Sequence, residues 1–181
     1  MEGLGHMNRE QLGITPVQFR ETADSFTKAY LEAALWSSSA EIGKCEDCGK
    51  LVIDTEDSDT CPDKECGGRV WGYDRSFQDH QCCIEECSPE LLARFMADCE
   101  KFQRENGELI TDENLKRANE HGLYEMAGHA FWLTRNGHGC GFWDGDWEKE
   151  AGEKLTKAAE AYGEVNLYAT LNDDGEITVH G

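Results

Sequence analysis

The chain has 181 residues, of which 39% are hydrophobic and 9% aromatic, so it can build the core of one domain and is not expected to be disordered. Its 37 acidic and 17 basic side chains give a formal net charge of −20 at pH 7. Nucleic-acid binding needs clustered Lys and Arg, so this charge argues against direct nucleic-acid contact and favours a protein partner with a basic surface. Because we find no apolar run of about 18 residues and no secretory leader, we expect a cytoplasmic protein without membrane association.

The first predicted element is a helix. Thr15, Pro16 and Gln18 give its start signal, a capping box with proline in the first turn, and Trp36 marks its predicted end. Five apolar residues recur at helical spacing and predict one buried face: Phe19, Ala23, Phe26, Tyr30 and Ala33. We assign residues 1–40 to the main domain, as its N-terminal helix.

Residues 41–75 are rich in Gly, Asp and Cys and predict an inserted zinc ribbon. Cys45 and Cys48 are separated by two residues, and Cys61 and Cys66 by four, spacings that allow all four thiolates to share one metal ion. Nine cysteines in a chain without a leader are expected to be reduced, which favours metal ligation over disulfides. Four thiolates fill a tetrahedral shell and leave no position for water, so we predict a structural Zn²⁺.

The predicted ribbon is itself acidic. Residues 41–72 contain nine acidic and four basic side chains, a net charge of −5, and four thiolates around one Zn²⁺ would add to it. Contact with DNA through this module is therefore disfavoured. A contact with a protein, or a purely stabilising role, fits the charge better.

A second metal site is a weaker hypothesis. His80, Cys82, Cys83 and Cys87 lie close together in residues 76–87, which otherwise have the composition of a linker, but they do not form a regular pair of metal-binding loops. The alternative is that some of these thiols are small buried hydrophobic groups, as we expect for Cys99 and Cys140.

Further helices are predicted after the linker. Ser88 and Pro89 repeat the cap-plus-proline signal and begin a second helix with the buried face Leu92, Phe95, Cys99 and Phe102. A shorter helix is expected after Thr111, ending near Gly122. Residues 147–162 predict an amphipathic helix.

Two hairpins complete the prediction. Residues 131–135 are expected to form a strand, Asn136 and Gly137 a tight turn, and residues 141–143 the returning strand. Residues 165–170 and 177–179 form the last hairpin around residues 172–175. The expected fold is therefore α+β, a small antiparallel sheet of hairpins packed on helices, with residues 76–181 forming the remainder of the main domain around the inserted ribbon.

Polar residues around the glycine-rich hairpin are candidates for a functional site. His129, Arg135, His138 and Asp144 lie near its turn, where packing gives no obvious reason for them. The alternative interpretation is a purely structural hairpin, and for the neighbouring aromatic residues we favour it.

Several segments resemble a family of small phage-encoded proteins of unassigned function. The run Phe-Trp-Leu-Thr-Arg-Asn-Gly-His-Gly at residues 131–139 is the most specific, within residues 127–144; residues 30–38, 98–102 and 163–168 are also similar. The ribbon resembles an insertion relative to shorter members. Ala130 stands where the family usually has Asp, and Cys140 where it usually has Ala, so the resemblance implies neither a His–Asp pair nor a Cys140 nucleophile. It implies origin and fold.

The leading functional hypothesis is a phage-type, non-enzymatic accessory protein. It would bind a protein partner through its acidic surface, for example by inhibiting a host nucleic-acid enzyme or by mimicking a polyanion towards it. One alternative is a small enzyme or ligand-binding protein with its site on the hairpin, although the sequence has no phosphate-binding loop or hydrolase triad. Another is a structural or homo-oligomeric module.

Overall fold

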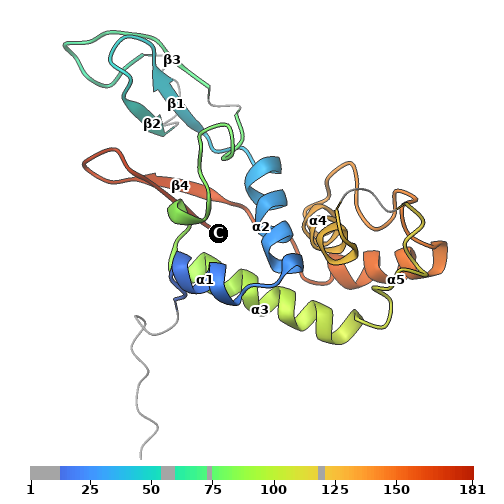
Figure 1. The fold of residues 1–181 in the computed structure, drawn as a ribbon. Helices are drawn as coiled ribbons and strands as arrows, with labels where there is room; N and C mark the ends of the chain where they lie inside the picture. The colour runs from blue at the N-terminus through green and yellow to red at the C-terminus, as the bar shows by residue number, and fades with distance from the viewer. Residues whose placement is uncertain (1–12, 54–59, 73–74, 118–120) are drawn as a thin grey trace, which may run out of the picture.

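The computed structural model describes residues 13–53, 60–72, 75–117 and 121–181. It has the predicted α+β class, with helices α1 (Pro16–Thr22), α2 (Ser25–Ser37), α3 (Pro89–Asn106), α4 (Leu123–Arg135) and α5 (Lys149–Glu160). Figure 1 shows these helices packed together, with three short strands at one end of α2 and the C-terminal hairpin between the two parts. We call residues 41–75 the ribbon, and the helices with the C-terminal hairpin the helical body.

The predicted N-terminal helix is divided into α1 and α2. Thr15 caps α1 with the expected capping box, in which its hydroxyl accepts from the Gln18 N–H. Ala23 then has an extended backbone and ends α1. Asp24 starts α2, because its carboxylate accepts a hydrogen bond of 2.8 Å from the Thr27 N–H. The buried apolar residues keep their helical spacing across this cap, and for that reason the sequence prediction missed the division into two helices.

The predicted glycine-rich hairpin is wrong: residues 131–135 belong to helix α4, and residues 141–143 form no strand. All five of these residues are buried, because α4 lies inside the helical body, between α2 and α5, and the run begins with three apolar residues. A short, continuous apolar run does not distinguish a buried strand from a buried helix. Gly128 allows the close packing, since a Cβ there would lie 2.1 Å from the carbonyl oxygen of Phe26 on α2.

An aromatic cluster from α2, α3 and α4 forms the centre of the core. The rings of Phe102 and Phe131 stack with centroids 4.0 Å apart, and Tyr30 meets Phe95 edge-on at 4.9 Å. The buried face predicted for α3 is confirmed, with Leu92, Phe95, Cys99 and Phe102 all buried. Helix α5 covers α4 and buries four residues, Ala151, Gly152, Leu155 and Ala159.

The short helix predicted after Thr111 is not found in the described residues 111–117, which form turns and a bridge from Leu115 to Trp147. Residues 118–120 of that prediction lie outside the described part of the chain. Gly122 starts α4 as its N-cap instead of ending a helix, and the Glu125 carboxylate accepts from its N–H at 3.1 Å.

The strands form two separate antiparallel sheets. In the ribbon, β1 (Ile42–Cys45) lies between β2 (Leu51–Ile53) and β3 (Val70–Trp71), with Gly43 opposite Val52 and Cys45 opposite Val70. The predicted C-terminal hairpin is confirmed as β4 (Tyr168–Leu171) and β5 (Ile177–His180). Its turn is closed by Asn172, whose side-chain oxygen accepts from the N–H groups of Asp174 and Glu176.

The ribbon is joined to the helical body at its base. Ile42 of β1 and the preceding Ala40 are buried in the main core, and β2 contacts β4. Farther out, Cys45, Cys61 and Val70 form a separate small cluster. The described residues in the far part of the ribbon therefore form almost no apolar core of their own.

Candidate functional site

Four cysteines of the ribbon converge on one point, as predicted. Cys45 ends β1, Cys48 lies in the following loop, and Cys61 and Cys66 lie before β3; all four sulfurs are within 4.8 Å of one another. The Sγ atoms of Cys45 and Cys66 are 3.6 Å apart, and those of Cys48 and Cys61 are 3.7 Å apart. Sulfurs arranged tetrahedrally about 2.3 Å from an ion would be roughly 3.8 Å apart. The arrangement is therefore that of a four-thiolate metal site.

Glycines let the two loops close around the sulfurs. Gly49 and Gly67 have positive φ angles of 73° and 64°, and the Gly49 N–H donates to the carbonyl of Cys45 at 3.0 Å. A Cβ on Gly68 would lie 2.8 Å from the Cys45 sulfur. The ligand loops are thus specified by both the cysteines and the glycines beside them.

The backbone also changes the acidity of the thiols. A hydrogen bond from the N–H of Cys48 lowers the pKa of Cys45 to about 7, although burial opposes it. At Cys66 the N–H of Gly68 lowers the pKa, but the nearby Cys48 and Cys45 thiols outweigh it and raise the pKa to about 12. Without an ion, four sulfurs this close cannot all lose their protons, and a divalent cation removes that repulsion.

The four residues of the weaker second-site hypothesis do not form a ligand group among the described residues. Burial raises the pKa of Cys82 to about 11 and that of Cys87 to about 12, so both thiols stay protonated. His80 instead places Nε2 3.3 Å from the carbonyl of Gly72. Cys83 is exposed and donates to the carboxylates of Glu85 and Glu86, at 2.9 and 3.1 Å.

Arg135, a candidate for a functional site, lies in the core. Its side chain is only 1% exposed, and it donates to the Tyr30 hydroxyl at 2.7 Å and to the Asp98 carboxylate at 2.8 Å. It also donates to the carbonyls of Tyr162 and Gly163, which follow α5. These bonds join α2, α3, α4 and the segment after α5, so they give Arg135 a structural explanation.

His138 lies at the ends of α2 and α4, away from the other candidates. Its Nε2 is 3.3 Å from the Ser37 hydroxyl, on a cavity of about 440 Å³. The Ser37 hydroxyl also accepts from the Trp132 indole N–H at 2.9 Å and donates to the carbonyl of Ala33 at 2.7 Å. Because the Ser37 proton goes to a backbone carbonyl, the arrangement ties the helix ends together and does not activate a nucleophile.

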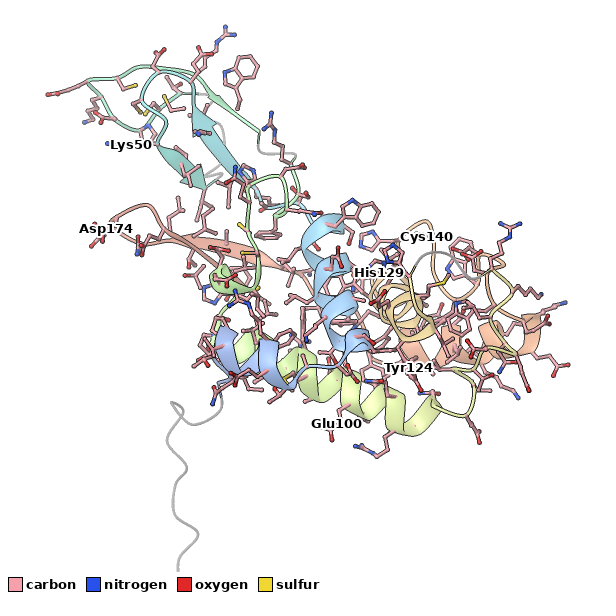
Figure 2. All side chains as sticks on the ribbon, in the orientation of Figure 1. Lys50, Glu100, Tyr124, His129, Cys140 and Asp174 are labelled. Atoms are coloured by element: carbon pink, nitrogen blue, oxygen red, sulfur yellow. The ribbon has the colours of Figure 1, made fainter. Side chains whose placement is uncertain are left out.

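His129 and Asp144 are the two candidates that share a cavity. It has a volume of about 260 Å³ and is also lined by His121, Cys140 and Asp146. Figure 2 shows His129 and Cys140 on the same side of the helical body, far from Lys50 of the ribbon. The four residues predicted as one site thus divide into a core arginine, a histidine at the helix ends, and this pair.

Sequence reasoning missed three residues beside His129. Glu32 lies on α2, His121 just before α4, and Glu125 on α4 one turn before His129. The spacing 121, 125 and 129 was visible in the sequence, but it is meaningful only in a helix. The sequence prediction ends a short helix near Gly122 and begins a strand at residue 131, so it does not place His121, Glu125 and His129 along one helix. The approach of Glu32 depends on the packing of α2 against α4.

Comparison of the chain with protein-family models, curated proteins and solved structures found no match. In the part of the chain that the structure describes, no helix combines the length and apolar character needed to cross a membrane.

Proposed function

We propose that this chain is a phage-type, non-enzymatic accessory protein that acts in the cytoplasm by binding a partner with a basic surface, and that Cys45, Cys48, Cys61 and Cys66 hold a structural Zn²⁺. The observation that carries the proposal is an exposed tryptophan beside a carboxylate on the ribbon. The thiolate set supports zinc, because four sulfurs complete its shell without water. In that role the ion fixes the ribbon, and the ribbon presents the contact surface.

Trp71 on β3 is the centre of this surface. It is 54% exposed, and its indole N–H donates to the Glu46 carboxylate at 3.0 Å. It lines a cavity of about 520 Å³ together with Thr60, Gly67, Arg69 and Val70. The Arg69 guanidinium lies 5.8 Å from the Trp71 ring centroid, so the protein already makes one cation–π contact there. Trp is enriched at interface hot spots, and a Lys or Arg of a partner would find both an aromatic ring and carboxylates.

The charge of the chain supports a basic partner. The net charge is −20 overall and −5 in residues 41–72, so both parts of the molecule repel nucleic acid and attract cationic surfaces. Enzymes that act on nucleic acids have such surfaces, because they must neutralise phosphates. We therefore propose that class of partner, with this chain occupying the surface as a polyanion would.

The test is capture of a partner from the host lysate on the immobilised, zinc-loaded protein, with washes of increasing NaCl and with double-stranded DNA as competitor. Binding should be retained at low salt, weaken steeply near physiological ionic strength, where screening acts over about 8 Å, and be displaced by DNA. Trp71→Ala and Glu46→Lys should each weaken capture while the zinc content stays unchanged.

Trp143→Ala is the matched control, because Trp143 is 55% exposed but lies outside the ribbon. Equal losses with Trp71→Ala and Trp143→Ala would contradict the proposed surface. Capture that resists both salt and DNA would contradict a polyanion-like contact. A chain that captures nothing but self-associates would favour the structural or oligomeric alternative.

A further inference from the structure

A cluster of two histidines and two glutamates lies on the helical body, at a distance from the ribbon. Glu32 comes from α2, His121 precedes α4, and Glu125 and His129 lie on α4. The Nδ1 atom of His121 is 3.6 Å from Oε2 of Glu125, and Nε2 of His129 is 3.9 Å from Oε2 of Glu32. The two imidazole centroids are 6.0 Å apart. All four side chains line one cavity of about 190 Å³.

The ring nitrogen of His129 has an unsatisfied bonding capacity. Its Nε2 atom is buried and makes no hydrogen bond to any described residue. The 3.9 Å to Glu32 is longer than a hydrogen bond. Buried polar atoms nearly always have a partner, so a nitrogen without one points to a group that completes it.

The protonation state fits a metal ligand. Burial lowers the pKa of the His129 imidazole, and the nearby Glu32 carboxylate only partly opposes this effect. A lowered pKa favours the neutral imidazole, the form in which a ring nitrogen binds a metal ion. The 3.9 Å between His129 Nε2 and Glu32 Oε2, with the Glu32 side chain 67% exposed, is also the geometry of a weak ion pair, so a salt bridge alone does not explain why the two groups face each other.

The solvent exposure of the other three side chains also favours a metal site over simple ion pairs. The side chains of Glu32, His121 and Glu125 are 67%, 50% and 43% exposed, and exposed ion pairs contribute little to stability. The ligand atoms of the four side chains do not all lie within 4.8 Å of one another, so binding a common ion requires these side chains to rotate, and their exposure permits it. Lys28 also lines the cavity, where two carboxylates, those of Glu32 and Glu125, offset its positive charge.

We propose that Glu32, His121, Glu125 and His129 bind one divalent first-row transition-metal ion, in a site separate from the four cysteines of the ribbon. Two imidazoles with two carboxylates are a ligand set for ions such as Zn²⁺ or Co²⁺, whereas Mg²⁺ and Ca²⁺ prefer oxygen ligands alone. The two sites differ in ligand chemistry, since the ribbon offers only sulfur. This difference makes them separable by spectroscopy.

The test uses the full-length protein with Zn²⁺ in the ribbon, titrated with Co²⁺ and followed by visible absorption and calorimetry. We expect one added equivalent of Co²⁺, with weak d–d bands and without the intense near-ultraviolet charge-transfer band of a cobalt thiolate. His129→Gln should weaken this binding by at least about tenfold, since even residues that only support a ligand change metal affinity by that factor. Glu32→Gln should also weaken it, and its exposed position keeps the fold intact.

His138→Gln is the control, because His138 contacts Ser37 and not this cluster. It should bind Co²⁺ as the unsubstituted protein does. The proposal is overturned if no Co²⁺ binds beyond the ribbon, if Glu32→Gln binds Co²⁺ unchanged, or if His138→Gln loses as much affinity as His129→Gln. A thiolate charge-transfer band that develops without release of Zn²⁺ from the ribbon would also overturn it, because Cys140 in the neighbouring cavity would then be a ligand.

Discussion

The ribbon and the helical body are organised around different polar centres. The ribbon has strands of four, three and two residues, and four thiols converge at its centre. The helical body has a large aromatic core and a buried guanidinium, that of Arg135, which makes four hydrogen bonds to groups of the same chain. One centre is thus completed by the protein itself, and the other needs an ion. The two regions should therefore lose their structure under different conditions.

The largest effect should come from removing a thiolate of the ribbon. Structural zinc sites contribute apparent binding energies of about 10–16 kcal/mol, which become folding energy where the apolar core is small. Cys48→Ser should therefore abolish thiolate-bound metal, measured as the charge-transfer band of the Co²⁺ form, and expose Trp71 further, while the helical circular dichroism remains. Cys140→Ser is the control and should keep the metal. Retention of the metal by Cys48→Ser would contradict a four-thiolate site.

The next largest effect is expected from a cavity in the aromatic core of the helical body. Phe131 is fully buried and stacks on Phe102, so Phe131→Ala should lower the free energy of unfolding of the helical body by about 3–5 kcal/mol. Urea unfolding followed by helical circular dichroism measures this change. The ribbon metal content should be unaffected in the folded variant. Trp143→Ala removes an exposed ring and should change stability little; similar losses in both variants would mean that the core is misplaced.

A smaller loss is expected at the polar centre of the helical body. Arg135→Met keeps the apolar stem but leaves Asp98 and Tyr30 without their donor. We expect a loss of about 3 kcal/mol, at the lower end of the range for a broken buried pair because the Asp98 side chain is 25% exposed. Arg94→Met, on the exposed face of α3, is the control. If Arg135→Met left the free energy of unfolding unchanged, the structural explanation of Arg135 would be wrong and a functional role would return as the alternative.

The smallest effect should come from the cap between α1 and α2. Asp24→Ala removes the hydrogen bonds to Thr27 and Gln103 and should destabilise the helical body by about 1 kcal/mol. Burial raises the pKa of Asp24, but these hydrogen bonds outweigh it and hold the pKa below the usual 3.8.

A lowered pKa means that the Asp24 carboxylate stabilises the folded state above about pH 4, and that this contribution is lost as the pH falls through the folded-state pKa. The difference in melting temperature between Asp24→Ala and the unsubstituted protein should therefore shrink on acidification. Glu153→Ala, at an exposed position on α5, should show no such trend. A pH-independent difference would mean that the cap acts without its charge.

The two regions were also predictable from the sequence to different degrees. The ribbon was found because its signal is local: two cysteine pairs at fixed spacing, each followed by glycine. The caps of α1 and α3, Thr15 and Ser88, were found for the same reason. Such signals need no knowledge of distant contacts.

Helix α4 was missed because its pattern is set by its surroundings. Buried by both α2 and α5, residues 130–135 show no polar face that would reveal a helical period. That single error also separated His129 from its neighbours, since Glu32 reaches it only through the packing of α2 on α4. Arg135 was predicted as a site residue because the sequence does not distinguish a buried arginine with internal partners from an exposed one.

The central claim is that a metal ion stabilises the ribbon, whereas the aromatic core stabilises the helical body. Its most direct test is hydrogen exchange of the full-length protein, measured by mass spectrometry with the ribbon metal bound and after its removal by a chelator. After removal of the metal, we predict that peptides covering β1 and β3 lose their protection from exchange, while peptides covering α3 and α4 keep theirs. Unchanged protection in the ribbon, or an equal loss in α3 and α4, would contradict it.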